Sequence, residues 1–348
     1  MNAIRDSKGQ PVAAALAGLG NHGLTIQNAV AESGLYNIVA VYDPDEREAG
    51  ASSKRFDCVA ADSFEGLIAT PGLEAVVLVS PNHLHRAQCE AAFAAGLHVF
   101  VEKPIANFVT DGVAIVQAAQ QSGRLLMVGH HMRRTASARL GEQLIREGKL
   151  GEVAAVEIHF SADNTRRMPP DAWRLRPDMC PLLPMMQLGI HAVDLMHAWF
   201  GGVSAVTARG RSITTKEGVY DAVSGLIELE SGIDVTIVST YCTQVLFEVR
   251  VAGTLGTLHF LPHSLWFRST EDTDRAGRGP GKLHDFSGAT PDAYTLQMME
   301  FAEAVRNGGP IETSGEVGLK ALAVVEAMNT SVEQSATVDL KELSTPVS

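Results

Sequence analysis

The chain has 348 residues, and its 28 Lys and Arg against 40 Asp and Glu give a formal net charge of -12. Apolar residues make up 45% of the chain and charged residues 20%, which excludes intrinsic disorder as a description of the whole. An acidic balance without a run of Lys or Arg argues against nucleic-acid binding, which needs a concentrated positive surface. This length predicts two or three domains, and we expect the partner to be a small molecule.

The four cysteines are widely spaced, and the sequence holds no CxxC pair. A zinc ribbon or a thioredoxin-like motif is therefore not expected, and the thiols are expected to be reduced in a cytoplasmic protein. The longest stretch without Asp, Glu, Lys or Arg covers residues 9–31 and contains Gln, Asn, His and Thr as well as glycines. Such a stretch is a poor bilayer span, so we predict no membrane contact.

The first 130 residues alternate short apolar runs with helical patterns. The apolar runs are nearly continuous, as is typical of strands buried on both faces of a parallel sheet. They span residues 11–17, 37–43, 74–80, 97–101 and 124–129. Helices are expected over 84–95 and from a cap at Thr110 to a stop at Gly123. This alternation predicts right-handed βαβ units and a doubly wound parallel sheet.

After about residue 130, strand patterns follow one another, several of them alternating apolar and polar residues. They span 151–160, 204–210, 222–230, 233–241 and 247–261. This succession favours an antiparallel or mixed sheet with one covered face. Helices are expected at 136–147, 190–200, 291–306 and 315–333, and an exposed loop at 269–291.

A glycine-rich turn, GLGNHG at residues 18–23, follows the first predicted strand and precedes a helical pattern. Asp43 stands twenty residues after the last glycine, at the end of the next strand, which is the context of the dinucleotide-binding fingerprint. Gly18 would form the tight turn, Gly20 would let the backbone approach a pyrophosphate, and Gly23 would allow close helix–strand packing. The helix N-terminus would face the anion. The alternative is a structural turn without a ligand.

The acid at Asp43 also bears on the choice of dinucleotide. Its carboxylate would accept hydrogen bonds from a ribose hydroxyl and would repel a 2′-phosphate, so we expect NAD. Arg47 lies close enough in sequence to weaken this preference, and NADP stays possible. The residues expected to contact the cofactor from this part of the chain are Gly18, Gly20, Asn21, His22, Gly23 and Asp43.

Two further predicted strands end in polar turns, SPNHLH at residues 80–85 and EKP at residues 102–104. Both turns fall at the carboxyl ends of strands in an open α/β sheet, where ligands bind. For His83 and His85 a capping or packing role is an equal alternative. The residues expected at the cofactor from these turns are Ser80, Pro81, Asn82, His85, Glu102 and Lys103.

Several strings of residues together resemble one known family. They are GLGNHG, the acid at Asp43, PNHLHRAQCEAAFAAGLHVFVEKPIA, LGIHAVD, FEVRVAGTLGTLHF and the closing GEVGLKALAVVEAMNTSVEQSATVDL. They are similar to the Gfo/Idh/MocA family of sugar and polyol oxidoreductases, and the Glu-Lys-Pro turn is the most specific of them. The resemblance covers nearly the whole chain. It implies an NAD(P)-binding Rossmann domain over residues 1–130. An α+β domain over 131–348 would follow, for substrate binding and oligomerisation, with an open, mainly antiparallel or mixed sheet and a last helix that packs back toward the first domain.

The resemblance also implies the catalytic residues. The nicotinamide would lie between the domains, with Lys103 beside the reacting carbon, where it helps to move the proton if its pKa is lowered. The family usually has an Asp, three residues and then a His at the start of a helix. Here Gln187 holds the Asp position and His191 the His position. His191 can act as a general base. Gln187 can donate hydrogen bonds but takes no proton, and without the carboxylate we expect the pKa of Lys103 to be lower than in Asp-bearing relatives.

A second departure lies just before that helix. Relatives often carry a Gly-Gly pair there, whereas this chain has CPLLP at residues 180–184. We expect these bulky side chains to narrow the pocket and to favour a substrate less polar than a free hexose. Upstream, Arg174 is a candidate clamp for a carboxylate or a ring hydroxyl, and a solvated loop arginine is the alternative. The residues expected at the substrate are Lys103, Trp173, Arg174, Gln187 and His191.

A run of His191, Asp194 and His197 resembles a metal motif only superficially. Steps of three residues drift round a helix, so the two imidazoles point apart and no metal is expected. Asp194 is expected to contact a backbone group or an arginine.

These observations predict an NAD(P)-dependent dehydrogenase or reductase that acts on a CH–OH group of a sugar, cyclitol or related polyol, with Lys103 and His191 handling the proton. One alternative is an enzyme of the glycosidase type that holds NAD tightly and uses it without net redox. Another is a non-catalytic dinucleotide-binding sensor, which Gln187 keeps open. The resemblance also implies a homodimer or homotetramer formed through the exposed face of the second sheet.

Overall fold

The computed structural model describes residues 9–274 and 279–340, and these form two compact units. Unit 1 comprises residues 9–131 and 291–319, and unit 2 comprises 132–274, 279–290 and 320–340. Unit 1 is therefore built from two separate stretches of chain, because residues 291–319 return to it before the chain re-enters unit 2. The functional ranges 1–130 and 131–348 stay a prediction.

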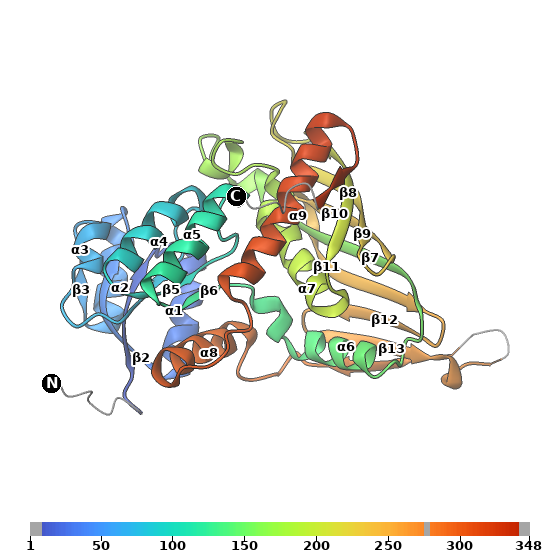
Figure 1. Cartoon of the computed structure of the whole chain (residues 1–348), viewed down its shortest axis with the longest axis horizontal. Helices are drawn as coiled ribbons and strands as arrows, with labels where there is room; N and C mark the ends of the chain where they lie inside the picture. Colours follow the sequence, from blue (N-terminus) through green and yellow to red (C-terminus); the bar gives the residue numbers. More distant parts are fainter. Residues whose placement is uncertain (1–8, 275–278, 341–348) are drawn as a thin grey trace. The chain divides into compact units, whose positions relative to one another are not determined.

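Unit 1 contains a six-stranded parallel sheet of order β3-β2-β1-β4-β5-β6 (Figure 1). Every residue of β4 and β6 is buried, as the continuous apolar runs predict. The α/β fold class is thus confirmed. The strands are β1 (Val12–Ala17), β2 (Tyr36–Tyr42), β3 (Val59–Ala60), β4 (Ala75–Leu78), β5 (His98–Val101) and β6 (Leu126–Val128).

Helices connect these strands and bury apolar side chains against the sheet. Phe301 of α8 meets Phe100 of β5 with ring centroids 5.9 Å apart, and α8 also packs against α1 (Figure 1). The expected cap at Thr110 is wrong, because α5 begins one residue earlier and Phe108 occupies the cap position without a side-chain hydrogen bond. The helices are α1 (Asn21–Ser33), α2 (Glu46–Phe56), α3 (Phe64–Ile68), α4 (His85–Ala94), α5 (Val109–Ser122) and α8 (Ala293–Asn307).

Unit 2 contains a nine-stranded mixed sheet of order β14-β13-β12-β11-β7-β10-β9-β8-β15, in which only the β7–β10 pair is parallel. The helices α6 (Ala136–Arg146) and α7 (Ile190–Phe200) and the second part of α9 (Gly315–Gln334) pack on one face. The strands are β7 (Val153–Asp163), β8 (Val203–Arg211), β9 (Ala222–Leu229), β10 (Asp234–Thr240), β11 (Cys242–Gly253), β12 (Gly256–Leu261), β13 (Ser264–Ser269), β14 (Lys282–Asp285) and β15 (Val338–Asp339).

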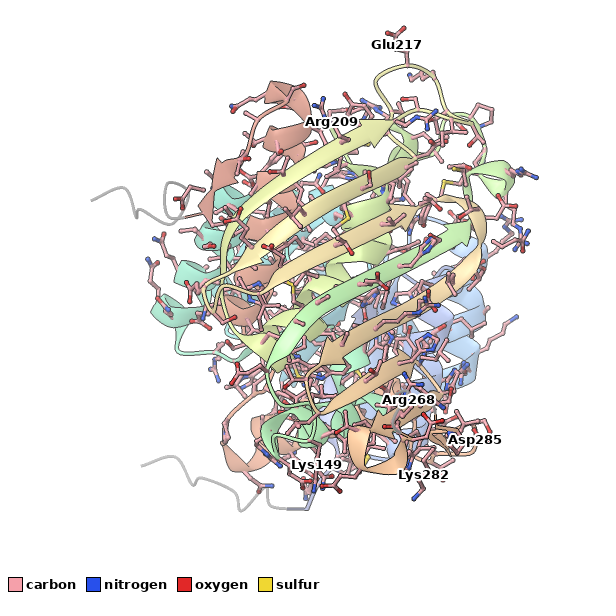
Figure 2. The ribbon with its side chains drawn as sticks, turned by 90° about the vertical axis from the view of Figure 1, so that its right-hand side faces the viewer. Lys149, Arg209, Glu217, Arg268, Lys282 and Asp285 are labelled. Atoms are coloured by element: carbon pink, nitrogen blue, oxygen red, sulfur yellow. The ribbon has the colours of Figure 1, made fainter. Side chains whose placement is uncertain are left out.

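The other face of this sheet is uncovered in the described chain, and Figure 2 looks onto it, with Arg209 on β8 and Arg268 on β13 labelled. One strand prediction and one loop prediction need correction. Residues 247–261 form parts of two strands, β11 and β12, because the chain reverses at residues 254–255. The expected loop at 269–291 includes β14, a polar edge strand paired with β13, whose sequence lacks the apolar alternation that marks a half-buried strand; residues 275–278 lie outside the described chain.

Within the described residues, the structure contains no helix with the length and apolar character needed to cross a membrane.

Candidate functional site

The glycine loop of unit 1 connects β1 to α1, and its glycines have different surroundings. At Gly18 φ is +88°, and a Cβ atom would lie 2.5 Å from the carbonyl carbon of Val79. At Gly23 a Cβ atom would lie 2.3 Å from the carbonyl oxygen of Gly18. At Gly20, by contrast, a Cβ atom would meet nothing within 4 Å. Packing therefore requires glycine at Gly18 and Gly23, while Gly20 leaves its space open to a ligand.

The first turn of α1 lies beside that space. Gly20 is its cap residue and supplies no side-chain hydrogen bond, and the first turn contains no acid. Because the first N–H groups of a helix lack partners within it and carry a partial positive charge, this terminus suits an anion. The arrangement fits the pyrophosphate of a dinucleotide.

Asp43 follows β2 and is tied to the glycine loop. Its Oδ2 accepts a hydrogen bond from the N–H of Leu19 at 2.7 Å, and its Oδ1 accepts one from the N–H of Asp45 at 2.9 Å. An ionised carboxylate has about four acceptor positions, so each oxygen can still accept a hydroxyl. The carboxylate is therefore held in place, with acceptor positions that fit a ribose hydroxyl.

Arg47, the residue expected to weaken the preference for NAD, is occupied locally. Its Nε and Nη2 donate to the carboxylate of Asp45 at 3.1 and 2.7 Å. The guanidinium holds the pKa of the Asp45 carboxyl at about 2. The charge that would attract a 2′-phosphate is thus already paired with an acid.

The turn after β4 contributes a buried amide. Asn82 is 5% exposed, and its Nδ2 has no hydrogen-bond partner among the described residues. Such a donor normally has a partner when buried, and a bound ligand would supply one. Ser80, on the same turn, donates from its hydroxyl to Oε1 of Gln88.

His85 joins the two polar turns. Its Nε2 lies 2.9 Å from the carbonyl oxygen of Ser80, and its Nδ1 lies 2.9 Å from that of Pro104. The side chain is buried, which lowers its pKa. A cofactor contact from His85 would require one of these contacts to be given up, so the geometry favours the packing alternative.

Glu102 forms the centre of a charged cluster at the end of β5. Its Oε2 lies 3.3 Å from Nε2 of His22 and accepts the backbone N–H of Lys103 at 3.2 Å. Burial opposes ionisation of Glu102, but His22, Lys103 and His131 outweigh it and lower its pKa to about 2. Lys103 therefore has a carboxylate neighbour even though Gln187 supplies none, a charge that the sequence argument about the lysine omitted.

Two aromatic residues of this cluster, Tyr294 and His131, were not predicted from the sequence. Tyr294, on α8, makes an edge contact with His22 at 5.9 Å between ring centroids and stacks on His131 at 3.8 Å. His131 follows β6, and ligands bind beyond the carboxyl ends of parallel strands. This position could have marked His131 as a candidate site residue. No comparable signal marked Tyr294, because its helix joins unit 1 from far along the chain.

In unit 2, Gln187 and His191 stand about one helical turn apart. Gln187 lies in a π-helical turn (Met185–Gly189) that continues directly into α7, and His191 is the second residue of that helix. Both side chains are mostly buried, at 7% and 8% exposed. π-Helical turns inside helices are frequent at functional sites.

Gln187 also holds Arg174. Its Oε1 accepts from Nε of Arg174 at 3.0 Å, and its Nε2 lies 3.5 Å from Sγ of Cys180. The guanidinium of Arg174 lies 4.3 Å from the centroid of the Trp173 ring. The structure thus brings Trp173, Arg174 and Gln187 together, and His191 follows Gln187 by four residues.

The neighbouring residues of unit 2 are structural. Asp194 accepts from Nε of Arg133 at 2.9 Å, which confirms the expected arginine partner. Leu182 and Leu183 are 4% and 1% exposed, so they pack into the protein and offer little surface to a substrate. The expectation that they make the pocket less polar is therefore not supported. Leu182 has a φ of +48°, a left-handed conformation that favours glycine.

Comparison with known proteins agrees with this description. Residues 12–130 match the model of an oxidoreductase family with an NAD-binding Rossmann fold, and residues 139–259 match the GFO/IDH/MocA C-terminal domain. The chain belongs to the GFO/IDH/MocA family of oxidoreductases. It is thus an NAD(P)-dependent oxidoreductase, and the glycine loop, Asp43 and Asn82 fit such a dinucleotide.

Relatives in the GFO/IDH/MocA family span most of the chain. A 1,5-anhydro-D-fructose reductase of Ensifer adhaerens is 28% identical over 81% of this chain and 84% of its own. Inositol 2-dehydrogenase 1 of Saccharopolyspora erythraea is 28% identical over 92% and 93%. Among solved structures, an NADPH-dependent oxidoreductase of Desulfitobacterium hafniense has a TM-score of 0.88 at 27% identity, covering 96% of this chain and 99% of that one. Levoglucosan dehydrogenase with NADH and levoglucosan shares the fold, with a TM-score of 0.86 at 20% identity over 95% and 100%.

Proposed function

We propose that this protein transfers hydride between NAD and a secondary alcohol or ketone of a sugar, cyclitol or related polyol. The observation that carries the proposal is the glycine loop, open at Gly20 and fixed to Asp43, in a chain that also has Lys103 and His191 at the family's motif positions. The names of the relatives, an anhydrofructose reductase and an inositol dehydrogenase, support this substrate class. Unit 1 would hold the dinucleotide and unit 2 would bind the substrate.

Within this proposal, Lys103 and His191 have different tasks. Glu102 places a negative charge beside Lys103, which favours the ammonium form. Lys103 would therefore donate a hydrogen bond to the reacting oxygen, and His191 would accept the hydroxyl proton. NAD, when bound, supplies the hydride acceptor for the substrate carbon that bears this oxygen. Gln187 takes no proton, and its role would be to hold Arg174.

The test is turnover by variants that still bind NADH. Lys103→Met and His191→Asn should each lower kcat with the best polyol or sugar of a broad panel by about 100-fold or more, since a positioned acid or base contributes about that much. Binding of NADH, followed by its fluorescence, should change by less than about threefold in His191→Asn and should stay measurable in Lys103→Met, because Lys103 is also expected at the cofactor. Unchanged turnover in either variant would remove that residue from the mechanism.

Gln187 favours a second candidate, because the usual carboxylate is missing. The chain would then bind NAD as a sensor without turnover. NAD binding with no NADH formed across the panel would support it. A cofactor that copurifies and is never consumed, together with cleavage of a glycosidic bond, would point instead to chemistry without net redox.

We also propose that the uncovered face of the nine-stranded sheet pairs with a second copy in a cytoplasmic homodimer or homotetramer. Leu226 on β9 and Val238 on β10 are exposed apolar side chains of this sheet. Light scattering of the native chain should give a mass of two or four copies, and the double variant Leu226→Lys/Val238→Lys should shift it toward one.

A further inference from the structure

Arg174 is a cation whose partners are neutral. Its Nε donates to Oε1 of Gln187 at 3.0 Å, and its guanidinium stacks on Trp173. Across residues 9–274 and 279–340 it forms no ion pair, whereas Arg176, two residues along, pairs with Asp178 at 2.8 Å. The charge of Arg174 is therefore not neutralised by the protein that the structure describes.

The guanidinium is held in place and still has donors to offer. Arginine carries five N–H donors in a planar fork, and only Nε is used here. The Nη1 and Nη2 atoms of Arg174 have no acceptor in the described part of the chain. The side chain is half-buried and fixed from two sides, by a mostly buried amide and by an aromatic ring. A fixed fork with free terminal nitrogens suits bidentate binding of a carboxylate.

Gln187 explains why the charge of Arg174 is not neutralised. An aspartate at this position would neutralise the guanidinium, whereas an amide orients it and leaves its charge in place. The contact of Nε2 with Cys180 fixes which way the amide points. Two acids of this part of unit 2 are engaged by other arginines, Asp178 by Arg176 and Asp194 by Arg133. No unpaired acid among these would repel an anionic ligand.

The charge of Arg174 also acts on a buried neighbour. Burial raises the pKa of Tyr241, and the nearby Arg174 works against that rise. Tyr241 directly follows β10 and is 5% exposed, so the charge of Arg174 reaches a buried residue.

We infer that the substrate is a carboxylated sugar or polyol, such as an aldonate or a uronate, and that the Nη1 and Nη2 edge of Arg174 binds its carboxylate. This inference rests on the proposed function, which assigns the sugar or polyol class. Beyond the proposed function, the inference specifies that the substrate is negatively charged. It also gives a reason why Gln187 stands where the family usually has an Asp. Arg174 is then a substrate-binding residue, separate from the proton-transfer residues.

The experiment compares acids with matched neutral molecules. A panel of aldonates and uronates is paired with the corresponding alditols and aldoses, for example D-gluconate with D-glucitol and D-glucuronate with D-glucose. Calorimetric binding to the full chain with NADH, and kcat/KM with NAD, are measured for each pair. We expect at least one acid to bind about tenfold or more tightly than its neutral partner. Arg174→Gln should weaken the binding of that acid by about 10- to 100-fold, the range for a charged hydrogen-bonded pair. The affinity for the neutral molecule should change by less than about threefold.

Three further variants make the result specific. Arg174→Lys keeps the charge without the planar fork of donors, and its affinity for the acid should lie between those of the wild type and Arg174→Gln. Gln187→Asp should weaken the binding of the acid by about tenfold or more, because the new carboxylate neutralises the charge of Arg174. Arg176→Gln, a matched arginine on the same loop, should leave the preference unchanged. Circular dichroism and Tm confirm that each variant folds.

Two outcomes overturn the inference: no acid of the panel binds better than its neutral partner, or Arg174→Gln weakens both members of a pair equally. In either case, oxidation of a neutral sugar by the wild type would leave the proposed function standing. Conversely, Arg174-dependent binding of an acid without NADH formation for any member of the panel would remove the redox proposal and keep the inference.

Discussion

The imidazole of His131 lies against the ring of Tyr294, with centroids 3.8 Å apart and planes 22° apart. The pair joins the end of β6 to α8, so residues far apart in the sequence meet beside Glu102. Burial lowers the pKa of His131 to about 3, although the charge of Glu102 opposes this. The ring is therefore neutral in the folded protein at neutral pH.

This pKa predicts a pH-dependent stability. Between about pH 6.5 and 3 the unfolded chain binds a proton at His131 that the folded chain does not, so the free energy of unfolding falls as the pH is lowered through this range. One group contributes at most about 1.4 kcal/mol per pH unit. Urea unfolding at pH 7 and pH 5 should show a smaller decrease in the free energy of unfolding for His131→Phe than for the wild type. This variant keeps an aromatic ring against Tyr294. His263→Phe, at an exposed position, is the control, and an equal loss in all three proteins would contradict the assignment.

The glycine loop predicts two different outcomes for one substitution. Gly20→Ala places a methyl group in open space, so the free energy of unfolding should change by less than about 1 kcal/mol, the usual scale for an accommodated Gly-to-Ala change. NADH binding should nevertheless weaken by about tenfold or more, because the methyl group occupies the approach to the pyrophosphate. Gly18→Ala meets the backbone of Val79 at a positive φ, and its main effect should be lost stability. NADH titration and urea unfolding of both variants distinguish these effects, and unchanged NADH affinity in Gly20→Ala would place the cofactor elsewhere.

The Asp45–Arg47 pair predicts the cofactor preference. The wild type should favour NAD over NADP in kcat/KM, because the Asp43 carboxylate, proposed to bind the ribose, would repel a 2′-phosphate and Arg47 is paired with Asp45. Asp45→Ser keeps a residue that can cap α2 but releases Arg47, and should raise the NADP/NAD ratio about threefold to tenfold. The double variant Asp45→Ser/Arg47→Ala should return the ratio to that of the wild type. A ratio that does not respond to Asp45→Ser would show that the pair has no influence.

The left-handed backbone at Leu182 predicts an inverted order of stabilities. Glycine usually destabilises a protein relative to alanine by about 0.5–1 kcal/mol, but at a positive φ alanine carries the steric cost, about 1–2 kcal/mol. Leu182→Gly should therefore be more stable than Leu182→Ala. At Leu183, which lacks a positive φ and is equally buried, the usual order should hold. Urea unfolding of the four variants is the measurement, and the usual order at both positions would argue against the strained conformation.

Much of unit 1 followed from local sequence. The continuous apolar runs identified β1, β2, β4, β5 and β6, and the spacing of GLGNHG and Asp43 predicted a glycine turn followed by an acid at the end of the next strand. The hydrogen bond from the N–H of Leu19 to Asp43 was not predicted and is a finding of the structure. These signals are local because a buried parallel strand and a tight glycine turn each impose a short residue pattern. The short α3 and β3 carry no such pattern and were not predicted.

The sequence by itself determined the fold class, the family and the identity of the residues at the motif positions, since each depends on residue types at fixed spacings. Only the tertiary structure decided how those residues are used. It placed Glu102 beside His22, stacked Tyr294 on His131, paired Arg47 with Asp45 and joined Arg174 to Gln187. Charge pairing and burial depend on side chains brought together through space, and no residue spacing specifies which neutral or charged group a side chain will meet.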